Sequence, residues 1–275
     1  MAQKKYQQRQ HQKHKKKYFT EEIRRYVEEK LLNDYSPEQI CGRAKIEGQA
    51  CVSHETIYQH IWRDKRKGGK LHEHLRRGNK RYRKRGNLKD NRGIIKDRIS
   101  IDERPEIVDA KERLGDLEID TIIGKNKKGA ILTIVDRYSG MVWIRKLESK
   151  KAKLLSEKVI EVLYPIKFLI HTITGDNGKE FAEHKMIAKQ LNINFYFAHP
   201  YHSWERGANE NVNGLIRQYI PKKTDFSSIT DEYIEYIQNK LNNRPRKRLN
   251  FLSPNEIFNK FVKSITNYKK VAFKT

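Results

Sequence analysis

A chain of 275 residues is long enough to hold one large or two modest domains with a buried core. Lysine and arginine number 59 against 34 aspartates and glutamates, so the formal net charge is +25. A chain so basic attracts polyanions, and its affinity for nucleic acid should fall steeply with salt. Because the sequence has no apolar run long enough for a membrane span, no signal peptide and no lipidation motif, it favours a cytoplasmic protein over a membrane protein. Cys41 and Cys51 are too few for a disulfide framework and lack the neighbours of a zinc site.

The first sixty residues indicate a DNA-binding module. Residues 1–18 are mostly Lys, Gln, His and Arg, so we expect a basic, flexible segment. Three short helices are predicted over residues 19–62, because Thr20, Ser36 and Ser53 each stand where a helix needs an N-cap. Ser36 also opens a capping box with proline at the first helical position. Three short helices, the last two joined by a turn, are typical of a helix-turn-helix.

In a helix-turn-helix the third helix, here residues 54–62, enters the major groove. We expect it to bury Ile57, Ile61 and Trp62. The side chains then available to bases and phosphates are His54, Thr56, Gln59, His60 and Arg63. A generic three-helix bundle with a solvated polar face explains the pattern equally well, and the basic flanks favour DNA.

Two further basic segments follow. A linker is predicted over residues 63–110, and its cations are expected to track the DNA backbone; those singled out are Arg81, Arg83, Lys84 and Arg85. A helical extension is predicted over residues 223–275, with helices that begin after Thr230 and Ser253. We expect it to pack on the core and to add phosphate contacts through Arg244, Arg246, Lys247 and Arg248.

The most informative stretch is residues 174–217. Asp176 follows a short apolar run and lies in a glycine-bracketed turn, so its carboxylate is predicted at the C-terminal end of a strand. Glu210 opens a run of helical periodicity, and Arg217 lies two turns further along on the polar face. Taken singly, each acid is more simply a turn former or a helix-end charge. Together they suit a metal ion and the phosphate that it activates.

A metal site for phosphoryl transfer requires a third carboxylate. Strand alternation over residues 116–123 places Asp116, Glu118 and Asp120 on one face. We choose Asp120 because it lies deepest in the apolar part of the run, where a lone carboxylate is costly unless it is paired. Asp116 is more simply the first residue of the strand. The sequence does not decide whether Asp116 or Glu118, if either, assists the site. Asp136 is predicted to be a hairpin-turn residue.

Over residues 111–222 the apolar patterns predict three strands, a helix, a strand, a helix, a strand and a helix. This order indicates an α/β domain with a mixed five-stranded sheet and flanking helices. The acids would lie on the first strand, the fourth strand and the last helix.

Three blocks, residues 117–120, 174–181 and 200–219, resemble the DDE motifs of the IS-thirty family of bacterial insertion-sequence transposases. The catalytic core of that family is similar to retroviral integrases and ribonuclease H, and the resemblance spans roughly residues 36–258. It implies a ribonuclease-H-like fold in which Asp120, Asp176 and Glu210 form the metal-binding triad. Arg217 stands where the family carries a basic residue after the glutamate.

The resemblance implies an enzyme, a transposase that cleaves DNA and transfers strands at the ends of an insertion sequence. Two Mg²⁺ ions per site are expected, with Mn²⁺ as a substitute. Expected partners are double-stranded DNA, namely the terminal inverted repeats and the target, and further copies of the chain in a dimer or larger assembly. No membrane and no small-molecule substrate is expected, and the protein is predicted to act in the bacterial cytoplasm at the nucleoid.

Two alternatives accompany this reading. Family members usually carry an earlier helix-turn-helix that contributes to recognising the terminal repeats, whereas this chain begins with its basic segment. The first alternative is therefore a truncated, inactive copy that regulates the element by binding DNA. The second is a ribonuclease acting on hybrid duplexes, which rests on the fold alone.

Overall fold

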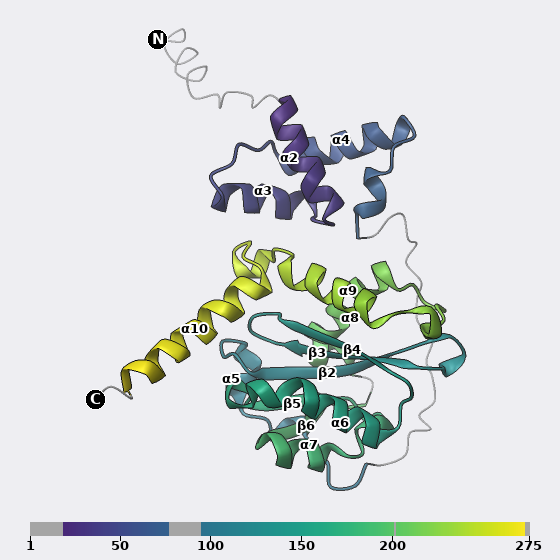
Figure 1. The fold of residues 1–275 in the computed structure, drawn as a ribbon, viewed down its shortest axis with the longest axis vertical. Coiled ribbons are helices and arrows are strands. Elements are labelled where there is room, and N and C mark those ends of the chain that lie inside the picture. Colours follow the sequence, from purple (N-terminus) through teal and green to yellow (C-terminus); the bar gives the residue numbers. More distant parts are fainter. Residues whose placement is uncertain (1–18, 77–94, 201, 273–275) are drawn as a thin grey trace, which may run out of the picture. The chain divides into compact units, whose positions relative to one another are not determined.

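The protein is described by a computed structural model that covers residues 19–76, 95–200 and 202–272, and the chain divides into two compact units, residues 1–80 and 81–275 (Figure 1). The first unit contains α2 (Glu21–Leu32), α3 (Pro37–Ile46) and α4 (His54–Arg66). Short 3-10 turns, η1 to η8, occupy Leu71–His74, Ile101–Glu103, Lys125–Lys127, Tyr164–Leu169, Lys179–Phe181, Ser203–Arg206, Phe226–Ser228 and Lys247–Leu249.

The three predicted N-terminal helices are confirmed. The side chains of Thr20, Ser36 and Ser53 each accept a hydrogen bond from a backbone N–H in the first turn of the helix that follows. The buried faces of the helices form one core, which includes Val27, Leu31, Ile40, Ile57 and Ile61. The prediction that Trp62 is buried is wrong, since this residue is 40% exposed and points away from the face that Ile57 and Ile61 share.

The second unit is built on a mixed sheet. Its strands are β1 (Ile99–Ser100), β2 (Asp116–Ile123), β3 (Ala130–Asp136), β4 (Val142–Leu147), β5 (Thr172–Gly175) and β6 (Asn194–Phe197). They lie in the order β1-β6-β5-β2-β3-β4, antiparallel from β2 to β4 and parallel from β1 to β2. The ribonuclease-H-like sheet is confirmed with one strand more than the five predicted. The extra strand, β1, comes from residues that we assigned to the linker.

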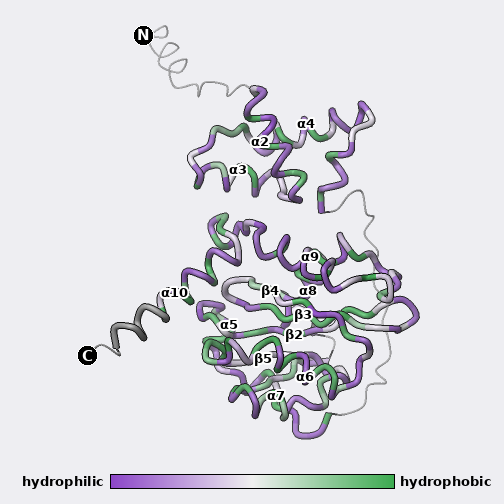
Figure 2. Tube along the Cα trace, viewed as in Figure 1, coloured by the Kyte–Doolittle hydropathy of each residue, from purple (hydrophilic) through white to green (hydrophobic). Residues whose placement is uncertain are grey.

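Helices cover both faces of this sheet (Figure 1). One face packs against α6 (Ala152–Leu163) and α7 (His184–Leu191), and the other against α8 (Gly207–Tyr219) and α9 (Asp231–Asn243). Alternation along β2 separates the two cores, and Figure 2 shows hydrophobic residues along the strands. The remaining helices are α5 (Glu106–Ala110) and α10 (Pro254–Ala272). Within the described ranges no helix is both long and apolar enough to cross a membrane.

Helix α9 protects the outer edge of the sheet. Among the strands that the structure describes, β4 lies at the edge of the sheet, so its outward backbone groups need other partners. Asn242 supplies two, because its Oδ1 accepts from Val142 N at 2.9 Å and its Nδ2 donates to Val142 O at 2.8 Å. Gln238 Oε1 accepts from Ile144 N at 2.9 Å. Side-chain amides of a helix thus continue the hydrogen-bonding pattern of the sheet.

Replacing Asn242 by Ala should destabilise the second unit. The change leaves two buried backbone groups of Val142 unpaired, at a cost on the order of 1–3 kcal/mol for each. Urea unfolding followed by circular dichroism measures the loss. Asn239→Ala is the matched control, since Asn239 lies on the same helix and is exposed. Equal effects of the two substitutions would contradict the edge-protecting role.

Candidate active site

The structure brings Asp120 and Asp176 together. Strands β2 and β5 are parallel, with Glu118 opposite Thr174, and each aspartate lies two residues further along its chain. The guanidinium of Arg206 lies against both carboxylates, with Nη1 3.2 Å from Asp120 Oδ2 and Nη2 3.6 Å from Asp176 Oδ2. One cation, 12% exposed, therefore joins the two acids.

Neutral donors hold both carboxylates in position. Asp120 Oδ1 accepts from Thr121 N at 2.8 Å, and its Oδ2 accepts from Asn213 Nδ2 at 2.9 Å. Asn213 is itself fixed, because its Oδ1 accepts from Thr133 Oγ1 at 3.1 Å. Asp176 Oδ1 accepts from Gly178 N at 2.9 Å. Strand, turn and helix thus each contribute to the placement of the pair.

The surroundings of Asp120 disfavour its charged form. Burial raises the pKa of the Asp120 carboxyl, Arg206 opposes that rise, and the neighbouring charge of Asp176 adds to it. Arg206, which lies against both carboxylates, supplies positive charge that favours the ionised form of Asp120.

Our reason for choosing Asp120, its depth, is wrong. The side chains of Asp116 and Glu118 are 2% and 1% exposed, whereas that of Asp120 is 22% exposed. Glu118 is engaged inside the fold: its Oε2 accepts from Asn209 N at 2.8 Å and its Oε1 lies 3.4 Å from Arg137 Nε. Burial raises the pKa of Glu118, and these two partners oppose the rise. The deepest acids of β2 therefore serve the fold, and the less buried Asp120 faces the site.

Helix α8 carries the other two predicted residues. It begins at Gly207, so Glu210 lies in its first turn, where the side chain is exposed. No group of three His, Cys, Asp or Glu side chains within the described residues is placed to hold a metal ion, so Glu210 does not converge with the two aspartates. Arg217 lies at the other end of α8, where Nη1 donates to Pro221 O at 3.2 Å and Nη2 to Ile123 O at 3.3 Å. It ties the end of the helix to the end of β2.

Sequence reasoning missed Arg206 and Asn213. Both lie about one helical turn from Glu210, Arg206 four residues before it and Asn213 three residues after it. That spacing places Glu210 and Asn213 on one side of α8, with Arg206 just before the helix, and Arg206 and Asn213 both contact Asp120. The signal was therefore present in the sequence as a helical face around Glu210.

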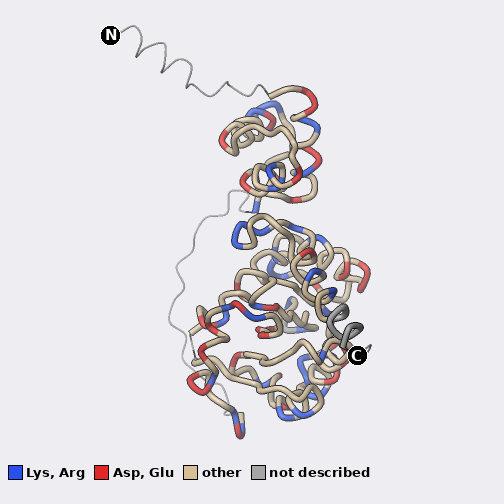
Figure 3. The backbone as a smooth tube through the Cα atoms, turned by 90° about the vertical axis from the view of Figure 1, so that its left-hand side faces the viewer, with Lys and Arg blue, Asp and Glu red and all other residues tan. Residues whose placement is uncertain are grey.

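The predicted DNA-contact residues divide into three groups. His54, Gln59 and Arg63 are exposed on α4, and Thr56 is half-buried beside the cap Ser53. His60 faces the interior of the first unit, where its Nε2 lies 2.8 Å from Glu28 Oε1 and its ring packs edge-on against Phe19. The linker residues Arg81, Arg83, Lys84 and Arg85 lie outside the described residues. Figure 3 shows basic and acidic residues interspersed over both units.

A mixed sheet of this order, with two aspartates at neighbouring strands and helices on both faces, agrees with a ribonuclease-H-like domain. Residues 91–203 match the family model "Integrase core domain". The chain is 60% identical over 273 residues to the transposase for insertion sequence element IS4351 of Bacteroides fragilis, covering 99% of this chain and 82% of that protein. It is 36% identical over 252 residues to transposase InsI for insertion sequence element IS30C of Escherichia coli, covering 87% of this chain and 65% of that protein.

Among solved structures, the catalytic core domain of BIV integrase is similar at 19% identity and a TM-score of 0.42, covering 56% of this chain and 97% of that chain. The sequence relatives establish the family. This chain belongs to the IS30 family of DDE transposases, and DNA transposition is its function. The expected resemblance is confirmed, and the alternative of a truncated regulator is not favoured.

His199 should make stability depend on pH. It lies just before η6, the turn that carries Arg206, and its ring bonds Glu205 Oε1 at 2.9 Å and Asp102 Oδ2 at 3.0 Å. These two carboxylates raise the pKa of His199. The stabilisation is therefore full below the pKa of an unfolded histidine and is lost as the pH rises through the folded value.

Thermal unfolding of the parent and of His199→Gln measures this effect. The parent should be the more stable protein at pH 6, and the difference should disappear by pH 9. Asp102→Asn, which neutralises one of the two carboxylates, should remove part of the same difference. A difference that is constant over this pH range would show that the histidine acts as an uncharged spacer.

Proposed function

We propose that this chain cleaves DNA and transfers DNA strands at the ends of its insertion sequence by metal-ion chemistry at Asp120, Asp176 and Glu210. The observation that carries the proposal is a pair of aspartates, Asp120 on β2 and Asp176 just after the parallel strand β5, held against one guanidinium. Membership of the IS30 family supplies the reaction class.

The residues present suit divalent ions of the Mg²⁺ type. Carboxylate oxygens are the ligands that Mg²⁺ prefers, and Mn²⁺ accepts the same donors. The guanidinium of Arg206 contacts both aspartate carboxylates, so a positive charge at this position is stabilised by the protein. Glu210 lies one turn beyond Arg206 on α8 and is the third donor that we propose. A pair of bound ions would activate the attacking water or 3′-hydroxyl and stabilise the leaving oxygen.

The chain's own residues orient this chemistry. Asn213 and the backbone of Thr121 hold both oxygens of Asp120, so the carboxylate is preorganised. We propose that Arg206 moves off the aspartates when metal enters and then donates to a DNA phosphate. Arg217, at the far end of α8, is proposed as a further phosphate contact.

DNA is the proposed partner of both units. The exposed His54, Gln59 and Arg63 of α4, with Thr56 beside them, are proposed to contact the terminal repeats. We omit His60 because it is engaged with Glu28. The basic linker residues 81, 83, 84 and 85 remain proposed backbone contacts. Two element ends must be handled together, which favours a dimer or larger assembly on nucleoid DNA in the bacterial cytoplasm.

Replacing Asp176 by Asn should abolish cleavage and joining of labelled DNA that carries the element's ends. Loss of a metal ligand removes several kcal/mol of transition-state stabilisation, a decrease of at least about a thousandfold. DNA binding should persist in the variant. Glu157→Gln, an exposed carboxylate on α6, is the control and should keep its activity. Cleavage retained in Asp176→Asn would overturn the assignment, and DNA binding without cleavage by the parent would revive the regulator.

Replacing Arg206 by Gln should strengthen Mg²⁺ binding in the absence of DNA. The variant leaves the two aspartates without their cation, so the metal-free protein should unfold at a lower temperature and gain more from added Mg²⁺. Thermal unfolding over a Mg²⁺ titration measures both effects. Lys158→Gln, which breaks a surface pair on α6, is the charge-matched control. An identical Mg²⁺ response in the parent and in Arg206→Gln would refute competition between arginine and metal.

A further inference from the structure

The second unit contains a cavity of about 250 Å³ beside the first turn of α8, and its lining includes none of the residues assigned to catalysis. Its ten described lining residues include four cations, Lys111, Arg137, Arg246 and Arg248, and no aspartate or glutamate. A cavity with this lining selects an anion.

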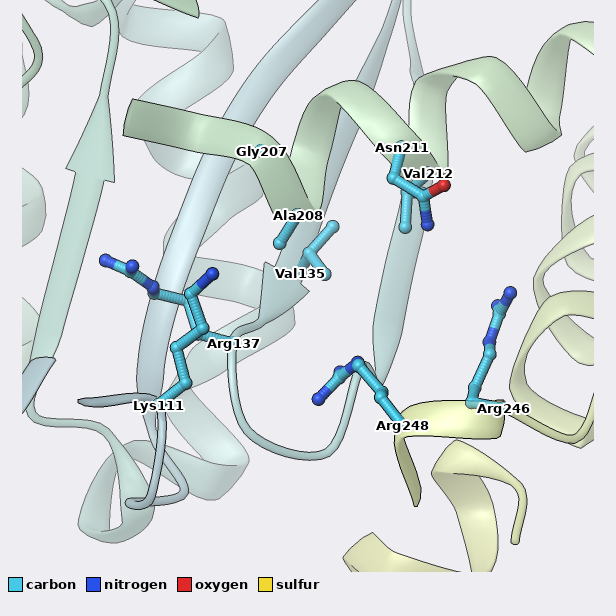
Figure 4. A pocket seen from close by; sticks show the side chains of 10 residues that line it. Lys111, Val135, Arg137, Gly207, Ala208, Asn211, Val212, Arg246 and Arg248 are labelled. Atoms are coloured by element: carbon cyan, nitrogen blue, oxygen red, sulfur yellow. The ribbon is translucent and has the colours of Figure 1, made fainter. Parts of the chain in front are cut away.

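The cations come from segments far apart in the sequence. Lys111 and Arg137 lie on one side, after α5 and β3, and Arg246 and Arg248 lie on the other, between α9 and α10 (Figure 4). The C-terminal extension, which we expected to pack on the core and to contact phosphate, thus supplies one wall of the cavity.

The position of Arg248 is fixed by the hairpin between β3 and β4. Its Nη1 donates to Tyr138 O at 2.6 Å. Gly140 makes room for it, because a Cβ at that residue would lie 2.7 Å from Arg248 Nη2, and the φ of Gly140 is +70°. The wall is therefore a defined part of the fold.

Carboxylates around the cavity do not cancel this charge. Asp109 and Glu118 each lie 3.4 Å from the guanidinium of Arg137. The negative charge of Asp136 favours the charged form of Arg248 and so opposes the lowering of the Arg248 pKa by burial. Asp109 also pairs with Arg104, so it is shared between two guanidinium groups. The side chain of Arg137 is 4% exposed, and its Nη1 has no hydrogen-bond acceptor within the described structure. Buried N–H groups of this kind call for an acceptor.

The remaining side of the cavity is the start of α8. A Cβ built on Gly207 would meet no heavy atom within 4 Å, so the first turn of the helix is open. The N-terminus of this thirteen-residue helix carries the positive end of the helix dipole. This feature adds to the four cations and points to the same ligand chemistry.

We infer that the cavity binds a phosphate group of the DNA backbone. The inference rests on the proposed function, since α8 carries Glu210, which follows Arg206 by about one turn, while its residues Gly207 and Asn211 line the cavity. A DNA strand that reaches the active site therefore passes the mouth of the cavity. A phosphate anchored there fixes the strand relative to Glu210.

Binding of a DNA duplex by the full chain, followed by fluorescence anisotropy over a range of NaCl concentrations without divalent metal, tests the inference. Lys111→Gln should lower the slope of log affinity against log salt by about 0.9, the value for one lost phosphate contact. Gly207→Asp should weaken binding as well, because it places a carboxylate at the cavity. The Gly207→Asp substitution should leave the fold intact, because a Cβ at residue 207 meets no heavy atom within 4 Å. Acidic residues are also favourable in the first turn of a helix.

Lys153→Gln on α6, an exposed cation on the opposite face of the sheet, is the charge-matched control and should leave the slope unchanged. Unchanged slopes in both cavity variants, or an equal change in the control, would overturn the inference. A second arm measures thermal unfolding with inorganic phosphate. A contrary result is that inorganic phosphate stabilises the parent and neither cavity variant, while the slope of log DNA affinity against log salt is the same in all three proteins. That result would identify a site for free phosphate and overturn the DNA assignment. Because no metal or turnover is involved, the result is independent of whether Asp176→Asn abolishes cleavage.

Discussion

The second unit depends on a repulsion that it must neutralise. The parallel pairing of β2 with β5 brings Asp120 and Asp176 to the same guanidinium, and like charges that share one site repel each other unless a cation lies against both. Arg206 meets this requirement from the turn that leads into α8. The same ion pairs therefore fix the aspartates and anchor the start of the helix that carries Glu210. The placement of the two aspartates and the anchoring of α8 therefore depend on one set of ion pairs.

A second buried network sets the position of α8 along the sheet. Glu118 accepts the backbone N–H of Asn209, one residue before Glu210, and lies against Arg137. Asp109 pairs with both Arg137 and Arg104, and so connects α5 to the same cluster. The Glu118–Arg137 pair, which is almost fully buried, contributes little net stability, because the desolvation of each charge offsets the attraction. The consequence of the network is geometric, since a helix held by a backbone N–H cannot slide along the strand without leaving a buried carboxylate unpaired.

Local signals in the sequence were sufficient for most of the fold. Capping residues located the N-terminal helices, and alternation along β2 placed its acids on one face, because both depend only on near neighbours in the chain. Strand β1 could not be predicted, since two residues show no alternation and its pairing with β6 is set by distant packing. Burial of the acids was misjudged for the same reason. Depth on a strand depends on which helix covers it, and that is a property of the assembled layers.

The candidate site was predicted as three acids and observed as two acids with an arginine. On the proposed assignment, the three carboxylates outnumber Arg206, so without metal the centre repels the phosphate on which it acts. The cations around Gly207 lie at the other side of the same helical turn and carry the opposite charge. DNA can therefore be held beside the centre before the centre itself is able to accept it. Divalent ions would then reverse the local charge and release Arg206 from the aspartates. A protein with a net charge of +25 attracts DNA over much of its surface, and the proposed order of events would confine the chemistry to strands already aligned along α8.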